Sequence, residues 1–520
     1  MARLSYVLIP GRHHALTRFQ ANYLHELVSG RMRDLEGEML ELAPEPTLVW
    51  AITSANHHNT RRNPIPANRR EVAIELFSSQ EGFRSLVIPV FDTQPTERFA
   101  EITLKAIEAG AESLPLDPTN CVVAVSTPSV IEMYRKLGFR IAPLELNHPD
   151  TPLRAWQVLE LCAAGDPAWS DLAHRATVDV FDRYGLAAQV AMVLHDPLVS
   201  AEGSLTDTRN YRAYAASFEA SAERKWAQAR PYVLPGRIVD VGCATGAILE
   251  LAARDSGLRE SDLFGIEVAQ HLFEECVHKK SQGVFANPNT FFFQRNILSG
   301  KVFPDSSINT SLTFSLTHEI VSYAGGIHAL TTLLGALFSQ AVPGGVWINS
   351  DVCGPVDGER EVLLRFKEAG LAHPPRNLDE LDPNETKRYL DSLAPAARFQ
   401  QFAQDFRRLA RSRFPFQQVD TRSVRLRLRD AMEFMSRFTY TDNWLSECHE
   451  RFCTLAWHDW TSIVRSAGFE IDPRSGPWTN EWMVENIFRP AVELTMLSGE
   501  VIPSPATHVF IVAIRPLAEV

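Results

Sequence analysis

Short apolar segments alternate with helical patterns along much of this 520-residue chain, and the alternation occurs twice. In the first part, "YVLI", "PTLVWAITS", "FRSLVIPVF" and "CVVAVST" each precede a helical pattern. A second series begins at "GRIVDVG" and continues with "DLFGIE" and "TFFFQ". Such alternation is typical of βαβ units with a parallel sheet. The sequence therefore predicts an α/β protein with two Rossmann-like parallel-sheet modules, the second carrying a helical cap insertion.

The points where the alternation stops give the predicted domain boundaries. We expect a first module over residues 1–187, a linker and packing helix over 188–225, and a second module over 226–520. Within the second module, about 358–452 separates the fifth strand from the rest of the core. Patterns such as "EREVLLRFKEAGL" and "VRLRLRDAMEFMSRF" predict that this insertion is helical.

Composition narrows the class of protein. The net charge of −12 and the pI of about 5.8 disfavour nucleic acid and anionic membranes as partners. No apolar stretch approaches the length of a membrane-spanning helix. The seven cysteines are scattered without a CxxC pair, which predicts reduced thiols and a cytoplasmic location. Cys448 and Cys453 lie near two histidines, but this spacing fits no standard zinc site, so no bound metal is expected.

Three loops of the first module follow predicted strands, where ligands of parallel sheets bind. These loops are "GRHHALTRFQ", "SANHHNTRRNPIPANRRE" and "STPSVIEMYRKLGF". The second loop is rich in arginine, which suits phosphate oxygens but also suits a solvated basic loop. Thr17 and Gln20 have the spacing of a helix capping box, and Ser126 and Thr127 could cap the next helix.

The order of these loops resembles the HIGH-motif nucleotidyltransferases, most closely the archaeal-type nicotinamide-nucleotide adenylyltransferases, over roughly residues 4–187. Gly11 and Arg12 match the first motif, "NTRRNP" and Arg70 resemble the second, and "TPLR" resembles the last. The resemblance implies nucleotidyl transfer or nucleotide binding, possible Mg²⁺ with a nucleoside triphosphate, and nucleotide contacts from Gly11, Arg12, His14, Thr17, Gln20, Arg70, Ser126, Thr151 and Arg154.

Two positions depart from that family. Gln20 stands where the family has its second histidine, and Phe19 stands where it has a glycine. Glutamine cannot carry the positive charge that stabilises phosphoryl groups, and we expect Phe19 to crowd the phosphate. His13 and His14 are candidates to replace the lost charge.

The second module opens on "VDVGCATG", in which an apolar strand ends at Asp240 and small residues precede a helix. Small residues let a ligand approach the backbone at a helix N-terminus. A dinucleotide site is the rival hypothesis, but the next strands end in Glu267 and Asn296, and "PGG" precedes the fifth. This order resembles the class I S-adenosylmethionine-dependent methyltransferases. The resemblance implies S-adenosylmethionine binding by Asp240, Gly242, Ala244, Gly246, Glu267, Arg295, Asn296 and Ile297.

The fourth strand leads into "SLTHEIVSY", which supplies the predicted catalytic pair. His318 is the candidate base and Glu319 its orienting partner or a substrate contact, although capping or packing would also explain His318. The predicted substrate pocket comprises Tyr323, Asp351, Tyr440, Trp444 and Glu447, although ordinary packing would also explain the aromatic side chains.

Together these patterns predict a bifunctional transferase that methylates a small molecule and transfers or binds a nucleotide. The alternative is a methyltransferase whose first module is catalytically degenerate and serves binding or assembly. A nucleic-acid methyltransferase is disfavoured by the acidic composition.

Overall fold

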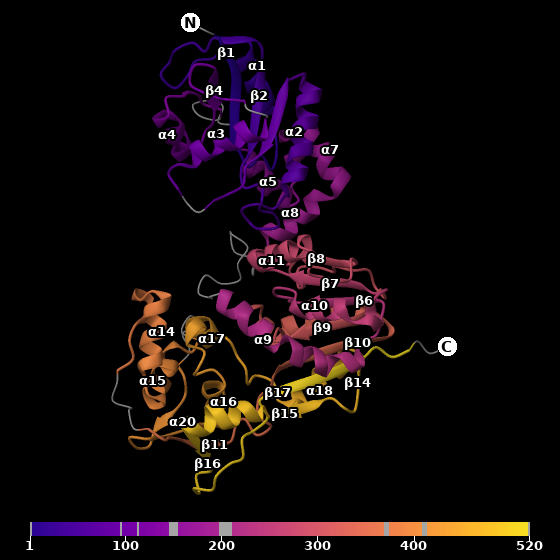
Figure 1. The fold of residues 1–520 in the computed structure, drawn as a ribbon, viewed down its shortest axis with the longest axis vertical. Coiled ribbons are helices and arrows are strands. Elements are labelled where there is room, and N and C mark those ends of the chain that lie inside the picture. Colours follow the sequence, from indigo (N-terminus) through magenta and orange to yellow (C-terminus); the bar gives the residue numbers. More distant parts are fainter. Residues whose placement is uncertain are drawn as a thin grey trace. The chain divides into compact units, whose positions relative to one another are not determined.

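The computed structural model describes residues 3–93, 96–111, 114–144, 154–196, 211–368, 374–407 and 413–517. The chain divides into two compact units, Met1–Gly203 and Ser204–Val520, each built around its own sheet (Figure 1). The predicted fold class, α/β with two parallel-sheet modules, is confirmed. No helix within the described ranges is long and apolar enough to cross a membrane.

The N-terminal unit has a five-stranded parallel sheet in the order β3-β2-β1-β4-β5. Its strands are β1 (Leu4–Gly11), β2 (Leu42–Ile52), β3 (Ser85–Pro89), β4 (Cys121–Ala124) and β5 (Arg140–Ala142). Its helices are α1 (Arg18–Val28), α2 (Ala67–Glu81), α3 (Phe99–Gly110), α4 (Pro128–Lys136), α5 (Ala155–Ala163), α6 (Ala168–Leu172), α7 (Arg175–Tyr184) and α8 (Leu186–Leu194).

Both faces of this sheet are buried. Val7 and Ile9 of β1 pack with α1 and α2, whereas Leu8 packs with α3 and α4 on the other face, as the two-residue period of a strand requires. The predicted capping box is present at the start of α1. The Gln20 amide donates to Thr17 Oγ1 at 3.2 Å, and the Thr17 amide donates to Gln20 Oε1 at 3.1 Å.

The C-terminal unit has an eight-stranded sheet, ordered β14-β17-β10-β9-β6-β7-β8, with β15 paired to β17. Strands β6 to β10 run parallel, and β17 is antiparallel to β10. The strands are β6 (Arg237–Val241), β7 (Asp262–Glu267), β8 (Thr290–Gln294), β9 (Ile308–Phe314), β10 (Ala341–Val352), β14 (Glu470–Ile471), β15 (Gly476–Trp478) and β17 (His508–Ile514). The order of the strands along the chain reverses between β6 and β9. The carboxyl ends of these two strands therefore mark the topological switch point of the sheet.

Helices cover the two faces of the main sheet. One face packs against α9 (Tyr211–Ala229), α10 (Ala247–Arg254) and α11 (Gln270–Ser281). The other packs against α12 (Thr317–Tyr323), α13 (Ile327–Gln340) and α18 (Trp457–Ser466).

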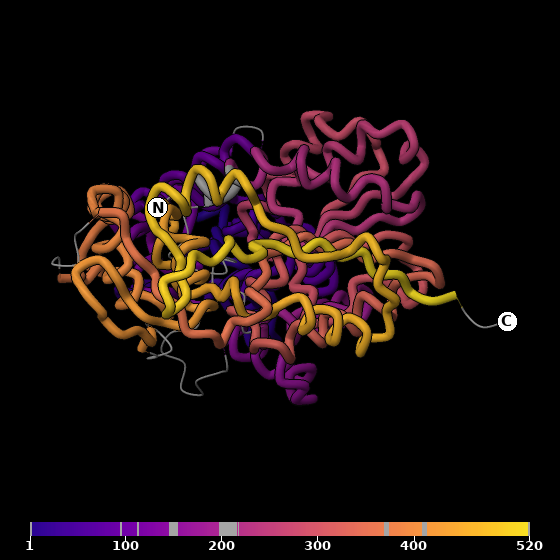
Figure 2. The backbone as a smooth tube through the Cα atoms, turned by 90° about the horizontal axis from the view of Figure 1, so that it is seen from below, coloured from indigo at the N-terminus to yellow at the C-terminus, as the bar shows by residue number. Residues whose placement is uncertain are grey.

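The cap, formed by the insertion after β10 together with a second segment between β15 and β17, contains a sheet that the sequence analysis did not predict. Its antiparallel strands, in the order β12-β13-β11-β16, are β12 (Gln417–Gln418), β13 (Ser423–Arg427), β11 (Glu361–Phe366) and β16 (Val492–Thr495). The helices around it are α14 (Pro383–Ser392), α15 (Pro395–Asp405), α16 (Leu428–Met435), α17 (Trp444–His449), α19 (Glu481–Met483) and α20 (Arg489–Ala491). Figure 2 follows the yellow C-terminal segment from this cap back into the main sheet.

The helical interpretation of "EREVLLRF" was therefore wrong for this segment, which forms β11. Val362, Leu364 and Phe366 are buried while the residues between them are more exposed, and this two-residue period is that of a strand. "SVRLR" likewise forms β13, and the helical part begins only at α16.

Candidate functional site

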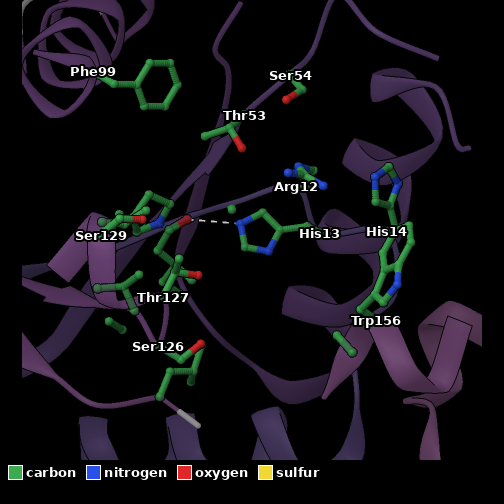
Figure 3. Close-up of a pocket in the computed structure, with 18 of the residues that line it drawn as sticks. Arg12, His13, His14, Thr53, Ser54, Phe99, Ser126, Thr127, Ser129 and Trp156 are labelled. Atoms are coloured by element: carbon green, nitrogen blue, oxygen red, sulfur yellow. Dashed lines mark hydrogen bonds between the residues drawn. The ribbon is translucent and has the colours of Figure 1, made fainter. Parts of the chain in front are cut away.

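A cavity of about 680 Å³ lies at the carboxyl ends of β1, β2 and β4 in the N-terminal unit. Figure 3 shows Arg12, His13 and His14 on one side of it and Ser126, Thr127 and Ser129 on another. The predicted nucleotide residues that line it are Gly11, Arg12, His14, Gln20, Ser126 and Arg154. This is the switch-point position at which open parallel sheets bind ligands.

The loops that line this cavity hold unusual backbone conformations. His13 has φ of +52° and Ser54 has φ of +53°, a left-handed region that residues other than glycine rarely occupy. His13 Nε2 lies 3.1 Å from the carbonyl oxygen of Ile9 (Figure 3), and its ring meets the edge of Trp50 with centroids 5.0 Å apart. Such strain clusters at ligand sites.

Both histidines of this loop are uncharged at neutral pH. Burial lowers the pKa of His13 to about 4, and the charge of Arg70 adds to that effect. Burial also lowers the pKa of His14 well below its ordinary value, as do the charges of Arg70 and Arg12. The His14 ring packs against Trp156 with centroids 6.1 Å apart. Neither side chain therefore restores the positive charge of the family's histidines.

Of the other three predicted positions, two lie elsewhere. Arg70 is buried and donates to the backbone oxygens of Arg12, Thr53 and Ser54 at 2.8–2.9 Å, so it fixes the loops and does not line the cavity. Thr17 is the buried helix cap described above. Thr151 lies outside the described residues. The expectation that Phe19 crowds the phosphate was also wrong, because Phe19 packs against Tyr23 and the core of the unit, away from the cavity lining.

In the C-terminal unit, every second residue of the loop after β6 is left-handed, at three positions. Gly242, Ala244 and Gly246 have φ of +71°, +47° and +78°. A Cβ on Gly242 would lie 2.9 Å from Leu316 Cδ1, so the Leu316 side chain would have to shift, and the positive φ of Gly242 also disfavours other residues. Ala244 takes the same region with a side chain, at a cost on the order of 1 kcal/mol.

Glu267, at the end of β7, ties this loop down. Its carboxylate accepts hydrogen bonds from the amides of Ala244, Val268 and Ala269 at 2.8–2.9 Å. A carboxylate offers about four acceptor positions, so these bonds leave it capacity for a ligand donor. Burial raises the pKa of Glu267 to about 7.

Asp240, at the end of β6, is fully buried, and neither of its carboxylate oxygens accepts a hydrogen bond from any described residue. Burial raises the pKa of Asp240 to about 8, although the positive charge of Lys225 opposes this rise. A buried carboxyl group without a partner costs free energy unless something complements it.

The predicted adenine contacts follow β8. Arg295 donates to the carbonyl oxygen of Gln294 at 2.9 Å, Asn296 Oδ1 accepts from the amide of Leu298 at 2.9 Å, and Ile297 packs on the sheet core. These positions lie at the same edge of the sheet as Glu267, and their cofactor roles stay predictions.

His318 is clamped between two carboxylates. Its Nδ1 lies 2.6 Å from Asp351 Oδ1 and its Nε2 lies 3.2 Å from Glu450 Oε2. All three side chains are buried. Burial alone would lower the pKa of His318, but the charges and hydrogen bonds of Asp351 and Glu450 raise it well above its ordinary value. The ring is therefore an imidazolium whose two N–H groups both donate to carboxylates.

Asp351 and Glu450, which engage both ring nitrogens of His318, were not predicted as its orienting partners. Glu319 does contribute to a group of possible metal ligands. One ligand atom each from His318, Glu319 and Glu450 lies within 4.8 Å of the others. The imidazolium occupies this space in the structure, so a metal would have to displace its proton.

The predicted substrate-pocket residues differ in their surroundings. Trp444 is buried in the cap core, where its indole N–H donates to Asp405 Oδ2 at 2.8 Å. Tyr323 donates to the carbonyl oxygen of Ser446 at 2.9 Å, and the carbonyl of Glu447 accepts from Arg437 at 2.6 Å. The carboxylate of Asp351 is hydrogen-bonded to the backbone amide and the ring of His318. Of the five, Tyr440 lines a cavity.

That cavity, of about 500 Å³, was not predicted as a whole. It lies at the carboxyl ends of β9 and β10, beside α9, β15 and α19. Its lining residues are Ser221, Arg224, Lys225, Gln228, Ser315, Ser350, Tyr440, Trp478, Asn480, Trp482, Met483, Ile487 and His508. In the sequence, the basic residues on α9 were the signal that could have indicated this cavity. The strand residues that complete its lining lie up to about 280 positions away from them.

Similarity to known proteins was found among solved structures. No family model and no curated protein matches this sequence. An S-adenosylmethionine-dependent methyltransferase from Methanosarcina mazei is 14% identical, with 55% of this chain and 96% of that one covered and a TM-score of 0.28. One from Aquifex aeolicus is 10% identical, covering 59% and 98%, with a TM-score of 0.29. The [4+2]-cyclase SpnF is 16% identical, covering 58% and 83%, with a TM-score of 0.26. Such values assign no activity to this chain.

Proposed function

We propose that the C-terminal unit is an S-adenosylmethionine-dependent methyltransferase acting on a small molecule. The observation that carries this proposal is the loop after β6, in which Gly242, Ala244 and Gly246 are left-handed at the switch point of the sheet. A side chain on Gly242 would push against Leu316 and would have to adopt a left-handed conformation. Beside it lie two buried carboxyl groups, Asp240 and Glu267.

The charge of these residues suits this cofactor. S-adenosylmethionine carries a sulfonium and an ammonium group, so it brings more positive than negative charge into the site. A cation beside Asp240 and Glu267 would favour their ionised forms and so relieve the effect of burial. The unpartnered oxygens of Asp240 would accept hydrogen bonds, and Glu267 keeps an acceptor position for a hydroxyl group. NAD, the cofactor of the rival hypothesis, is anionic overall.

When bound, the cofactor supplies a methyl group that forms a bond to the acceptor as the S–CH₃ bond breaks and its electron pair stays on sulfur. The residues of this chain then act mainly by alignment, which is worth several kcal/mol in such displacements. His318 holds Asp351 and Glu450 together at the start of α12, so we assign it a positioning role in place of the predicted role as a base. Its protonated ring has no lone pair to accept a proton.

Calorimetry of the full chain tests the cofactor assignment. We expect S-adenosylmethionine and S-adenosylhomocysteine to bind one site per chain, and we expect NAD not to displace S-adenosylhomocysteine from that site. Failure of S-adenosylmethionine to bind, or displacement of S-adenosylhomocysteine by NAD, would overturn the proposal.

For the N-terminal unit we propose nucleotide binding without nucleotidyl transfer. The 680 Å³ cavity brings Arg12 and Arg154 to the switch point of the sheet, where guanidinium groups suit phosphate oxygens. Catalysis would need further positive charge at the transferred phosphate. Gln20 cannot supply it, and His13 and His14 are neutral because burial lowers their pKa values. This favours the degenerate-domain hypothesis over the bifunctional one.

Replacing Arg12 with glutamine tests that assignment. We expect ATP or CTP to stabilise the full chain in thermal melts, and expect R12Q to weaken nucleotide affinity about tenfold or more, since one charge-assisted bond is worth roughly 1.5–3 kcal/mol. Arg98, an exposed residue paired with Glu101, provides the matched control R98Q. Pyrophosphate release from ATP and nicotinamide mononucleotide that R12Q abolishes would show that the unit is catalytic.

A further inference from the structure

The 500 Å³ cavity at the ends of β9 and β10 has a lining of one charge sign. Its ionisable lining residues are Arg224, Lys225, His508 and Tyr440, and no aspartate or glutamate lines it among the described residues. The chain as a whole carries a net charge of −12. The positive charge of this lining differs in sign from the net charge of the protein. A ligand bound there would need a complementary, negative charge.

Lys225 is the most constrained of these groups. Its side chain is buried to 9% exposure, its Nζ lies 3.1 Å from Ser315 Oγ, and the ammonium lies 4.1 Å above the Phe218 ring. It forms no ion pair with any described carboxylate. Burial lowers the pKa of Lys225 to about 8, although the charges of Asp351 and Asp240 oppose this. Buried charges are normally paired, so a ligand that carries a negative charge would complement this ammonium.

Part of the lining is aromatic. His508 stacks on Trp478 with centroids 4.6 Å apart and planes at 22°, and the Arg224 guanidinium lies 5.8 Å from the Trp478 ring centre. Burial and the charge of Arg224 lower the pKa of His508 to about 4, so this ring is neutral. Tyr440 and Trp482 add two more aromatic side chains. This surface suits stacking of a planar ligand.

Backbone geometry sets this cavity apart from ordinary packing gaps. Ser315, which receives the Lys225 contact, has φ of +52°. Ile487 reaches the lining from a π-helical turn at Val484–Phe488. Strained residues and π-turns both concentrate at ligand sites.

We propose that this cavity binds the methyl acceptor, and that the acceptor is a small planar molecule bearing a carboxylate that pairs with Lys225 and Arg224. The assignment of the acceptor class rests on the proposed methyltransferase function, because the cavity lies at the same sheet edge as the Gly242 loop. Ser315, Ser350 and Asn480 supply further polar groups around the carboxylate. A volume of about 500 Å³ lies within the usual range for small-molecule pockets.

Two pairs of probes test the carboxylate preference. The full chain is saturated with S-adenosylhomocysteine and titrated, by ligand-observed NMR, with benzoate or indole-3-acetate and with the corresponding neutral amides. We expect each carboxylate to bind at least about tenfold more tightly than its amide. Equal binding of acid and amide, or tighter binding of the amide, would overturn the proposal.

Lys225→Met shows whether the preference comes from this cavity. Methionine keeps the length of the buried stem and removes an unpaired charge, so the fold should be retained in a thermal melt. We expect K225M to lose the preference for the carboxylate, and R224Q to reduce it. Lys301, an exposed residue paired with Asp305, gives the control K301M, which should keep it. A carboxylate preference that survives in K225M would place the acid elsewhere and overturn the assignment.

The same titrations separate this proposal from the cofactor assignment. If S-adenosylhomocysteine does not bind but the carboxylate preference depends on Lys225, the methyltransferase function fails and the anion site stands. If S-adenosylhomocysteine binds and acid and amide bind equally, the acceptor class fails and the cofactor site stands.

Discussion

Replacing His318 with leucine is expected to destabilise the C-terminal unit by about 3–5 kcal/mol, because breaking a buried ion pair leaves an uncompensated charge. In H318L, Asp351 and Glu450 would both remain buried without the imidazolium that lies between them. A role limited to accepting a proton in catalysis would predict little change in stability.

Urea unfolding of the full chain, followed by a probe in the C-terminal unit, measures this effect. The control is H458L, since His458 is exposed and contacts only its neighbour Asp459 among the described carboxylates. We expect H458L to stay within about 0.5 kcal/mol of the unmodified protein. If H318L lost less than about 1 kcal/mol of unfolding free energy, the contacts of His318 with Asp351 and Glu450 would contribute little to stability. The positioning role would then have to be abandoned.

The difference between the protein and H318L should depend on pH in a definite direction. The pKa of His318 is raised, so its stabilising contribution is complete below its ordinary value of 6.5 and is lost as the pH rises through the raised value. The pKa of Asp351 is lowered to about 2, because the charge and hydrogen bond of His318 outweigh burial, so its contribution is lost as the pH falls toward that value. The difference should therefore be largest between pH 3.8 and 6.5.

Local patterns predicted much of this architecture. The alternation of apolar strands and helices gave both sheets, and the T-x-x-Q spacing gave the cap that Thr17 and Gln20 form. The small residues after Asp240 marked a loop that does adopt left-handed conformations. Each of these features depends on residues close together in the chain.

The features that sequence reasoning missed depend on residues far apart. His318 was singled out, but its partners Asp351 and Glu450 lie 33 and 132 residues away. Nothing in the neighbouring residues indicates that both ring nitrogens are engaged. Lys225 and Ser315 meet across 90 residues, and the cavity that they share needs the packed sheet to exist. In the cap, β11 was missed because its sequence was interpreted as a helix. The two-residue burial period of Val362, Leu364 and Phe366 is that of a strand.

Replacing Asp240 with asparagine should change stability and cofactor binding in opposite directions. Burial raises the pKa of Asp240 to about 8 from its ordinary 3.8, so between these values the folded state holds a proton that the unfolded state has lost. The contribution of Asp240 to stability then falls as the pH rises from about 4 to 8, with a limiting slope of about 1.4 kcal/mol per pH unit. Asparagine has the same shape and does not titrate, so D240N should become increasingly more stable than the unmodified protein over this range.

Cofactor affinity should move the other way. With S-adenosylmethionine bound, an ionised Asp240 would face a cation, and asparagine would lose this charge-assisted interaction, worth roughly 1.5–3 kcal/mol. Calorimetry should show affinity weakened by about 10- to 150-fold in D240N. Asp305, an exposed residue paired with Lys301, provides the control D305N, in which neither quantity should change. Because a variant that simply misfolds loses both stability and binding, higher stability with weaker binding identifies Asp240 as a ligand group. Unchanged affinity in a stabilised D240N would remove Asp240 from the cofactor site.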